Sequence, residues 1–140
     1  MSQNVYGAGA DDLNGEFWTL LAAGRFHLQQ CMGCKRHRFP PNNVCPFCHS
    51  LAYRWLPAAG AGVVYSYTLI RRAPSEEWAA CAPYYLIAAR LAEGPLVLGH
   101  LRAPAEFPVD VGTPVDLVVV ATPGTRPIYE FEPARRVSAS

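Results

Sequence analysis

The sequence predicts a mostly-β protein with a short helix near its start, a zinc ribbon after the helix, and a small β-barrel in its second half. Two C-x-x-C pairs, separated by ten residues, predict the ribbon. Five β-like segments within about seventy residues, separated by turn signals, predict a closed or partly closed barrel. The thirteen prolines and eleven glycines favour turns and short strands over long helices.

We divide the chain into five segments. Residues 1–12 are small and polar and are expected to form a flexible leader. Residues 13–24 predict a helix, because Phe17, Leu20 and Leu21 recur at helical spacing and Gly24 stands at the stop position. The ribbon, the barrel and a tail then follow as residues 25–59, 60–133 and 134–140.

The strands are predicted from alternation and from runs of branched and aromatic residues. In the ribbon they cover residues 26–30 and 53–56. The ten residues between the cysteine pairs leave room for two short strands, with Pro40-Pro41-Asn42-Asn43 as the turn. The sequence favours a long loop over residues 71–83. It also favours a buried strand over residues 115–120, where the apolar run is nearly continuous. The five barrel strands are expected at residues 63–70, 84–91, 96–101, 115–120 and 128–131.

The four paired cysteines predict a structural zinc site with Cys31, Cys34, Cys45 and Cys48 as ligands. Four thiolates complete a tetrahedral zinc, so no open position remains for Lewis-acid chemistry. A disulfide framework is not favoured, because the first residues lack the basic start and apolar run of a secretory signal. The sequence from Cys45 to His49 fits the C-x-x-C-H pattern of haem attachment, but that reading leaves the first pair unexplained.

Composition excludes several classes of function. The formal net charge of +1 argues against a protein whose main function is to bind nucleic acid. No apolar run approaches the length of a membrane span. Cysteines that look metal-bound, without an export signal, point to a reducing cytoplasm.

No catalytic constellation emerges from the sequence. It contains no G-x-S-x-G motif, no phosphate loop before a helix and no H-E-x-x-H motif. Cys81 is the single cysteine outside the pairs, and His100 could serve it as a base only through an unproven tertiary contact. We therefore expect a protein that is not an enzyme by itself.

Two basic clusters are candidates for binding phosphate groups, either of coenzyme A or of a nucleic-acid backbone. The near-neutral chain favours the smaller ligand, although exposure to solvent is the ordinary role of such residues. The helix also carries Trp18 away from its apolar stripe, where the indole either folds back on the ribbon or docks on another protein. The phosphate-binding candidates are Lys35, Arg36 and Arg38 between the cysteine pairs, and Arg71 and Arg72 after the first barrel strand.

The order of these parts resembles the family named as domain of unknown function thirty-five. The resemblance covers roughly residues 13–133 and lies in three motifs that occur in that family's order. They are Phe17-Trp18 with the helix, Arg38-Phe39-Pro40-Pro41 between the two cysteine pairs, and Gly62-Val63-Val64-Tyr65-Ser66-Tyr67-Thr68 at the start of the barrel.

The resemblance implies a rubredoxin-like zinc ribbon, with one structural zinc per chain, followed by an OB-fold barrel. It further implies an acyl-CoA-associated, non-catalytic subunit that bridges subunits and helps shape an acyl-CoA channel in a thiolase-superfamily complex of lipid or aromatic metabolism. The partner, a thiolase-like or aldolase-like enzyme, then carries the catalytic group in a heteromer. We expect Phe17, Trp18 and Leu21 to contact that partner.

Two rival functions remain open at this stage. One is a single-stranded nucleic-acid-binding module, for which an OB-fold is a common scaffold. The other is a free-standing acyl-CoA binding protein. Binding of an oligonucleotide and binding of acyl-CoA by the isolated chain are the observations that would favour them.

Overall fold

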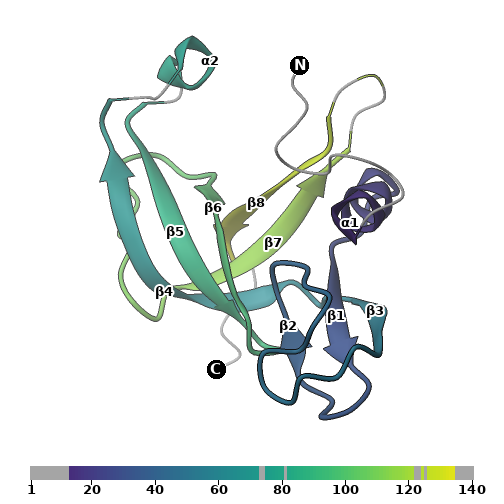
Figure 1. The fold of residues 1–140 in the computed structure, drawn as a ribbon. Helices are drawn as coiled ribbons and strands as arrows, with labels where there is room; N and C mark the ends of the chain where they lie inside the picture. Colours follow the sequence, from purple (N-terminus) through teal and green to yellow (C-terminus); the bar gives the residue numbers. More distant parts are fainter. Residues whose placement is uncertain (1–12, 73–74, 81, 122–123, 125, 135–140) are drawn as a thin grey trace. The chain divides into compact units, whose positions relative to one another are not determined.

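The computed structural model describes residues 13–72, 75–80, 82–121, 124 and 126–134 (Figure 1). They fall in two compact units. The first contains the residues up to Ala59 together with Glu93–Pro95 and Val119–Tyr129. The second contains Gly60–Ala92, Leu96–Val118 and the residues from Glu130 onward. Each unit is described by itself.

The first unit begins with helix α1, Leu13–Ala22. Gly24 adopts φ 101°, a left-handed conformation that glycine reaches without steric cost. The Gly24 N–H donates to Leu21 O at 2.8 Å and the Arg25 N–H donates to Leu20 O at 3.4 Å. These two bonds form a Schellman motif, so the predicted stop residue ends the helix by the expected mechanism.

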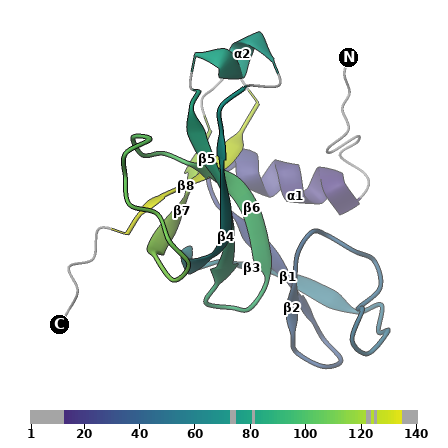
Figure 2. The same ribbon diagram turned by 90° about the vertical axis from the view of Figure 1, so that its left-hand side faces the viewer.

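Three strands form the sheet of the first unit (Figure 2). Strand β1, His27–Cys31, lies in the centre and pairs antiparallel with β2, His37–Arg38, and with β3, Tyr53–Pro57. The pairing of Cys31 with Tyr53 carries the sheet up to the first cysteine pair. The sheet therefore holds both ends of the segment that contains the four cysteines.

An aromatic cluster forms the core of the first unit. Phe17 of α1 lies with its ring centroid 5.3 Å from Phe26 and 5.5 Å from Phe39. Tyr129 packs edge-on against Phe26 at 4.9 Å. Leu21 and Leu28 are fully buried in the same unit. The apolar stripe of the helix thus packs inside the chain itself.

The second unit contains a closed five-stranded barrel in the order β4-β5-β6-β8-β7. Strand β4 pairs antiparallel with β5 and with β7, and β5 pairs antiparallel with β6, whereas β6 and β8 run parallel. This combination of a three-stranded meander and a parallel closing pair agrees with an OB-fold. The strands are β4, Ala61–Ile70; β5, Tyr84–Leu91; β6, Leu96–Leu101; β7, Pro114–Val120; and β8, Ile128–Pro133.

A glycine makes room for the largest buried side chain of the barrel. Phe131 of β8 is fully buried. A Cβ atom at Gly99 of β6 would lie 2.9 Å from the Phe131 ring, closer than such atoms approach one another in proteins. Gly99 is therefore required for the closure of β6 against β8.

Two sequence expectations about the barrel are corrected. The segment expected as a continuous loop contains the single-turn helix α2, Glu76–Ala79, which begins after Ser75. Ser75 is a favourable N-cap residue, and the Ala79 N–H donates to Ser75 O at 3.0 Å. The expected burial of β7 is also wrong, since only Val115 is buried along it. The outer face of a barrel strand has no second layer above it, so an apolar run does not guarantee burial.

The remaining strand predictions are confirmed to within two residues at each end. The leader, Cys81 and most of the tail lie outside the described residues. Among the described helices, neither has the length or the apolar character needed to cross a bilayer.

Glu16 links α1 to the ribbon sheet, and its removal is expected to weaken the first unit. Glu16 Oε1 accepts hydrogen bonds from the Tyr53 hydroxyl at 3.1 Å and from Trp55 Nε1 at 2.9 Å. We predict that Glu16→Ala lowers the free energy of unfolding by about 1–2 kcal/mol, because two bonds to a charged acceptor are lost. Glu16→Gln, which keeps one acceptor oxygen, should lose less than half of that. Chemical denaturation measures both variants, and equal stability of Glu16→Ala and wild type would contradict the link.

Candidate metal centre and basic pocket

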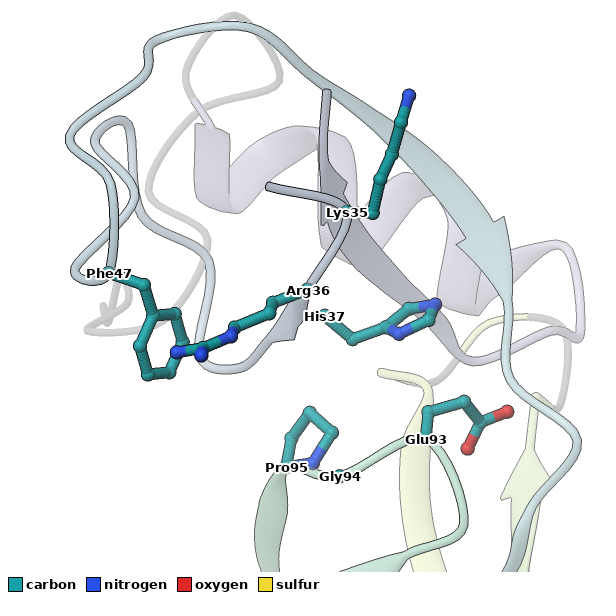
Figure 3. A pocket seen from close by; sticks show the side chains of 7 residues that line it. All are labelled: Lys35, Arg36, His37, Phe47, Glu93, Gly94 and Pro95. Atoms are coloured by element: carbon teal, nitrogen blue, oxygen red, sulfur yellow. The ribbon is translucent and has the colours of Figure 1, made fainter. Parts of the chain in front are cut away.

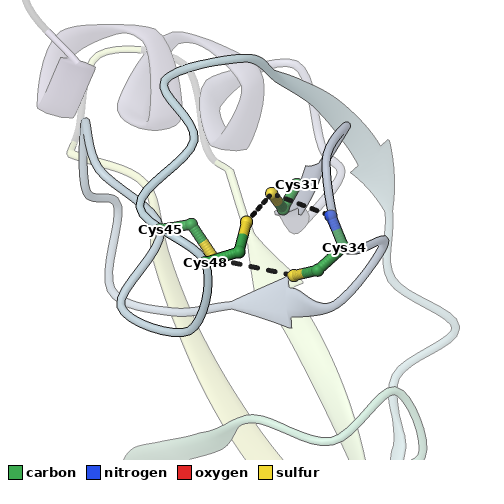
Figure 4. Close-up of side chains that lie close together, drawn as sticks. All are labelled: Cys31, Cys34, Cys45 and Cys48. Atoms are coloured by element: carbon green, nitrogen blue, oxygen red, sulfur yellow. Dashed lines mark hydrogen bonds between the residues drawn. The ribbon is translucent and has the colours of Figure 1, made fainter.

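The four cysteine side chains of the first unit meet at one point (Figure 4). Their sulfur atoms all lie within 4.8 Å of one another. Cys31 Sγ is 3.5 Å from Cys48 Sγ, and Cys34 Sγ is 3.7 Å from Cys45 Sγ. Zinc–sulfur bonds of about 2.3 Å in a tetrahedron place neighbouring sulfurs about 3.8 Å apart. The four thiols therefore fit a tetrahedral zinc.

The two cysteine pairs have the same local geometry, and we call each pair with its following residue a knuckle. The Lys35 N–H donates to Cys31 O at 2.9 Å, and the His49 N–H donates to Cys45 O at 2.9 Å. Lys35 and His49 both adopt left-handed backbone conformations, with φ 70° and 67°. Each knuckle is thus one tight turn, and two such turns facing one another bring the four sulfurs together.

Backbone groups prepare the sulfurs for a metal. The N–H groups of Cys34 and Gly33 donate to Cys31 Sγ at 3.4 and 3.2 Å. The bond from Cys34 is the largest cause that lowers the pKa of the Cys31 thiol to about 6, although burial acts in the opposite direction. Cys31 is therefore readily deprotonated, as a metal ligand must be.

The pKa of the Cys48 thiol is shifted in the opposite direction. The Ser50 N–H lowers the pKa of the Cys48 thiol, but the Cys31 sulfur, burial and the sulfurs of Cys34 and Cys45 together outweigh that bond and raise the pKa to about 11. Four thiolates this close repel one another, so a divalent cation among them is needed to keep all four deprotonated at neutral pH. Burial also differs among the ligands, since Cys31 and Cys45 are buried whereas Cys48 is exposed.

Beside the first knuckle the first unit has a basic pocket of about 420 Å³. The Arg36 guanidinium carbon lies 4.4 Å from the centroid of the Phe47 ring. Figure 3 shows Arg36 extended along Phe47, with His37 facing the turn that contains Gly94 and Pro95. Lys35 also lines the pocket, but its side chain points away from Arg36 in this view. The sequence placed His37 in the same basic run, residues 35–38, but it gave no sign that Phe47 joins these cations.

Arg38 is not available to a phosphate, which corrects the sequence-based expectation. Its side chain is 6% exposed. Nε donates to Gln29 Oε1 and to Asn42 O, both at 3.1 Å, and Nη2 donates to Asn42 O at 2.7 Å. Arg38 thus holds the loop after β2 against β1. Arg71 and Arg72 are exposed and belong to the second unit, after β4.

Of the three residues expected to contact a partner, two are buried and one is partly exposed. Phe17 and Leu21 are 2% and 0% exposed and lie in the core of the first unit, so the expectation that they contact a partner is corrected. A helix this short must bury its apolar side chains to be stable, so Phe17 and Leu21 are not available to a partner. Trp18 is half-buried, with its ring centroid 6.5 Å from that of Tyr129 and 5.7 Å from the Arg126 guanidinium carbon. Only Trp18 of the three keeps surface for a partner.

Two family models match adjacent parts of this chain. Residues 18–54 match the rubredoxin-like zinc ribbon domain of ChsH2, and residues 55–120 match the C-terminal OB-fold domain of ChsH2. The four clustered cysteines are therefore the metal ligands of a zinc ribbon. The match also supports the assignment of the barrel as an OB-fold.

Two curated relatives cover the chain in part. A probable enoyl-CoA hydratase alpha subunit of Thermomonospora curvata is 34% identical over 72% of this chain. A DUF35 domain-containing scaffold protein of Pyrococcus furiosus is 33% identical over 67% of it. The matched regions are 31% of the hydratase subunit and 64% of the scaffold protein, so the chain spans only part of the length of either relative.

Two solved structures are similar over most of the chain. The Ltp2-ChsH2(DUF35) aldolase matches with a TM-score of 0.76 and 30% identity, over 88% of this chain and 95% of that one. A DUF35-family protein of unknown function from Sulfolobus solfataricus matches with a TM-score of 0.61 and 16% identity, over 89% and 87% of the two chains. The second match concerns the fold alone.

The metal should be required for the ribbon to fold. We predict one zinc per chain after purification without added metal, and loss of both zinc and ribbon structure in Cys34→Ser, because a structural site contributes its binding energy to folding. Elemental analysis and circular dichroism measure the two effects. Cys81→Ala is the matched control and should keep its zinc. Clearly substoichiometric zinc in the wild type, or haem absorbance, would contradict the assignment.

The left-handed backbone at His49 gives a test of the knuckle geometry. A residue with a Cβ atom is strained at this φ, whereas glycine is not. We therefore predict that His49→Gly raises the free energy of unfolding of the zinc-bound chain by about 0.5–1 kcal/mol. His49→Ala keeps the Cβ atom and should bring no gain. Thermal unfolding in the presence of zinc compares the two, and an equal or greater gain for the alanine variant would argue against this conformation.

Proposed function

Because this chain belongs to the DUF35 family, with the zinc ribbon and OB-fold of ChsH2, we propose that it is a non-catalytic subunit of an enzyme complex that acts on acyl-CoA. Its similarity over 95% of a chain whose structure is named as an Ltp2-ChsH2(DUF35) aldolase carries this proposal. The names of the two curated relatives, a hydratase subunit and a scaffold protein, point the same way.

The partner in this proposal is a thiolase-like or aldolase-like catalytic subunit, and the complex is a heteromer in the cytoplasm. The zinc has a structural role in it. Four thiolates fill a tetrahedral coordination sphere, so the metal stabilises the ribbon and offers no site for substrate. This chain bridges subunits and contributes one wall of the acyl-CoA channel.

The basic pocket is the part of the first unit that suits the phosphate groups of coenzyme A. Arg36 is held by Phe47 and, among the described residues, neither Arg36 nor Lys35 forms an ion pair. A guanidinium that is already positioned loses little side-chain freedom when it binds an anion. Glu93 also lines the pocket, and its carboxylate points away from Arg36 in Figure 3. Its Oε2 accepts a hydrogen bond from the Ala59 N–H at 2.8 Å, whereas its Oε1 has no hydrogen-bond partner among the described residues. Arg71 and Arg72 of the second unit remain further candidates for phosphate contacts.

The nucleic-acid rival rests on exposed tyrosines of the barrel. Tyr65 is 53% exposed and Tyr67 is 41% exposed. However, the Arg90 guanidinium carbon lies 5.0 Å from the centroid of the Tyr65 ring, so one face of that ring is covered. Tyr67 packs edge-on with Tyr85, with their ring centroids 6.1 Å apart. Because bases stack on open aromatic faces, this arrangement favours the acyl-CoA proposal over the rival.

The division of labour between the subunits can be tested by activity. We predict no thiolase, aldolase or hydratase turnover by the purified chain alone, and turnover when it is coexpressed with its thiolase-like or aldolase-like partner subunit. Cys81→Ala should leave the complex fully active, because the catalytic group belongs to the partner. Turnover by the isolated chain, or loss of activity in a correctly assembled Cys81→Ala complex, would overturn the non-catalytic role. Tight, salt-dependent binding of a single-stranded oligonucleotide would instead support the rival.

A further inference from the structure

The charge of the zinc ribbon differs from that of the rest of the chain. Residues 25–59 contain five of the twelve Lys and Arg residues and none of the eleven Asp and Glu residues. The described acids of the first unit, Glu16 and Glu93, are engaged with Tyr53, Trp55 and Ala59. These five cations outnumber the net negative charge of a zinc ion bound by four thiolates, so the ribbon is basic although the whole chain is nearly neutral. A basic surface attracts an acidic one.

The knuckles also expose apolar side chains next to these charges. Met32 is 38% exposed, Phe47 is 54% exposed and Leu51 is 70% exposed. The Met32 N–H donates to Ala52 O at 2.9 Å, which places the first knuckle beside Leu51. We call Met32, Phe47 and Leu51, with the neighbouring Lys35 and Arg36, the knuckle surface.

Close packing restrains the knuckle surface, and a zinc ion shared by the four sulfurs would restrain it further. A Cβ atom at Gly33 would lie 3.1 Å from Ser50 Cβ and 3.2 Å from Cys48 Sγ, so the two knuckles are packed against one another. Arg36 is further held by the Phe47 ring. A rigid surface loses little entropy on binding, and arginine next to an aromatic residue is typical of the residues that dominate protein interfaces.

We propose that the knuckle surface is the docking site for an acidic, partly apolar surface of the catalytic partner subunit. This inference rests on the proposed function, in that it names where the partner binds. A protein fits better than a nucleic acid because Met32 and Leu51 are aliphatic and offer no flat face on which a base could stack. The surface shares Lys35, Arg36 and Phe47 with the basic pocket, so an acyl-CoA bound there would lie in the interface.

Substitutions of Leu51 test both the position and the charge of this surface. The side chain is exposed, so its replacement should leave the zinc content unchanged. With the coexpressed partner, Leu51→Glu should weaken binding by about tenfold or more, because it removes an apolar contact and adds a charge that the acidic partner repels. Leu51→Lys should weaken binding less, because it loses the contact but keeps the favourable charge. Leu98→Glu on β6, where Leu98 is 62% exposed, is the matched control and should bind like wild type.

The outcomes separate this inference from the function on which it rests. Wild-type chain that fails to bind the partner would overturn the proposed function, and the docking site with it. A wild-type complex that tolerates Leu51→Glu, or is weakened equally by Leu98→Glu, would overturn the docking site alone. Equal losses for Leu51→Glu and Leu51→Lys would overturn the acidic character of the partner surface. Binding of a single-stranded oligonucleotide that Leu51→Glu abolishes would assign the surface to nucleic acid and overturn the inference.

Discussion

The convergence of four thiolates is the constraint on which the first unit depends. Sulfurs within 4.8 Å of one another repel when deprotonated, so this arrangement is stable only around a cation. To reach it, two separate turns must have the same shape, which explains why Lys35 and His49 share a conformation that costs each of them strain. The metal thereby replaces the large hydrophobic core that a segment of this size cannot build.

The aromatic cluster is the second source of stability in this unit, and it decides which helix residues remain available. Phe17 is surrounded by Phe26, Phe39 and Tyr129 at ring distances between 5.3 and 6.3 Å. A short helix is stable only when its apolar side chains are buried. Phe17 and Leu21, which the sequence suggested as partner contacts, therefore pack in the core of the unit. The exposed apolar surface of the unit is found instead at the knuckles, where the metal rather than packing maintains the backbone.

The basic side chains of the proposed binding surface lie in the same ribbon as the four cysteines. Basic residues in a segment without acids would repel one another in a flexible chain. The zinc–thiolate centre carries negative charge and lies directly beneath them, because four thiolates exceed the charge of one zinc ion. Arg38 lies inside the unit, where oxygens of Asn42 and Gln29 accept hydrogen bonds from its Nε and Nη2, while Nη1 has no partner among the described residues. The remaining cations keep their charge at the surface, available to a ligand and a partner.

The sequence by itself determined the zinc ligands, the end of α1 and nearly all strands, because these depend on local spacing: two C-x-x-C pairs, a glycine at the C-terminal helix position and runs of branched residues. Only the tertiary structure decided the roles of Phe17, Leu21 and Arg38. Their burial depends on residues distant along the chain, such as Tyr129 for Phe17 and Gln29 for Arg38. The pairing of Arg36 with Phe47 is likewise invisible in the sequence, because the metal brings together two turns that no periodicity connects.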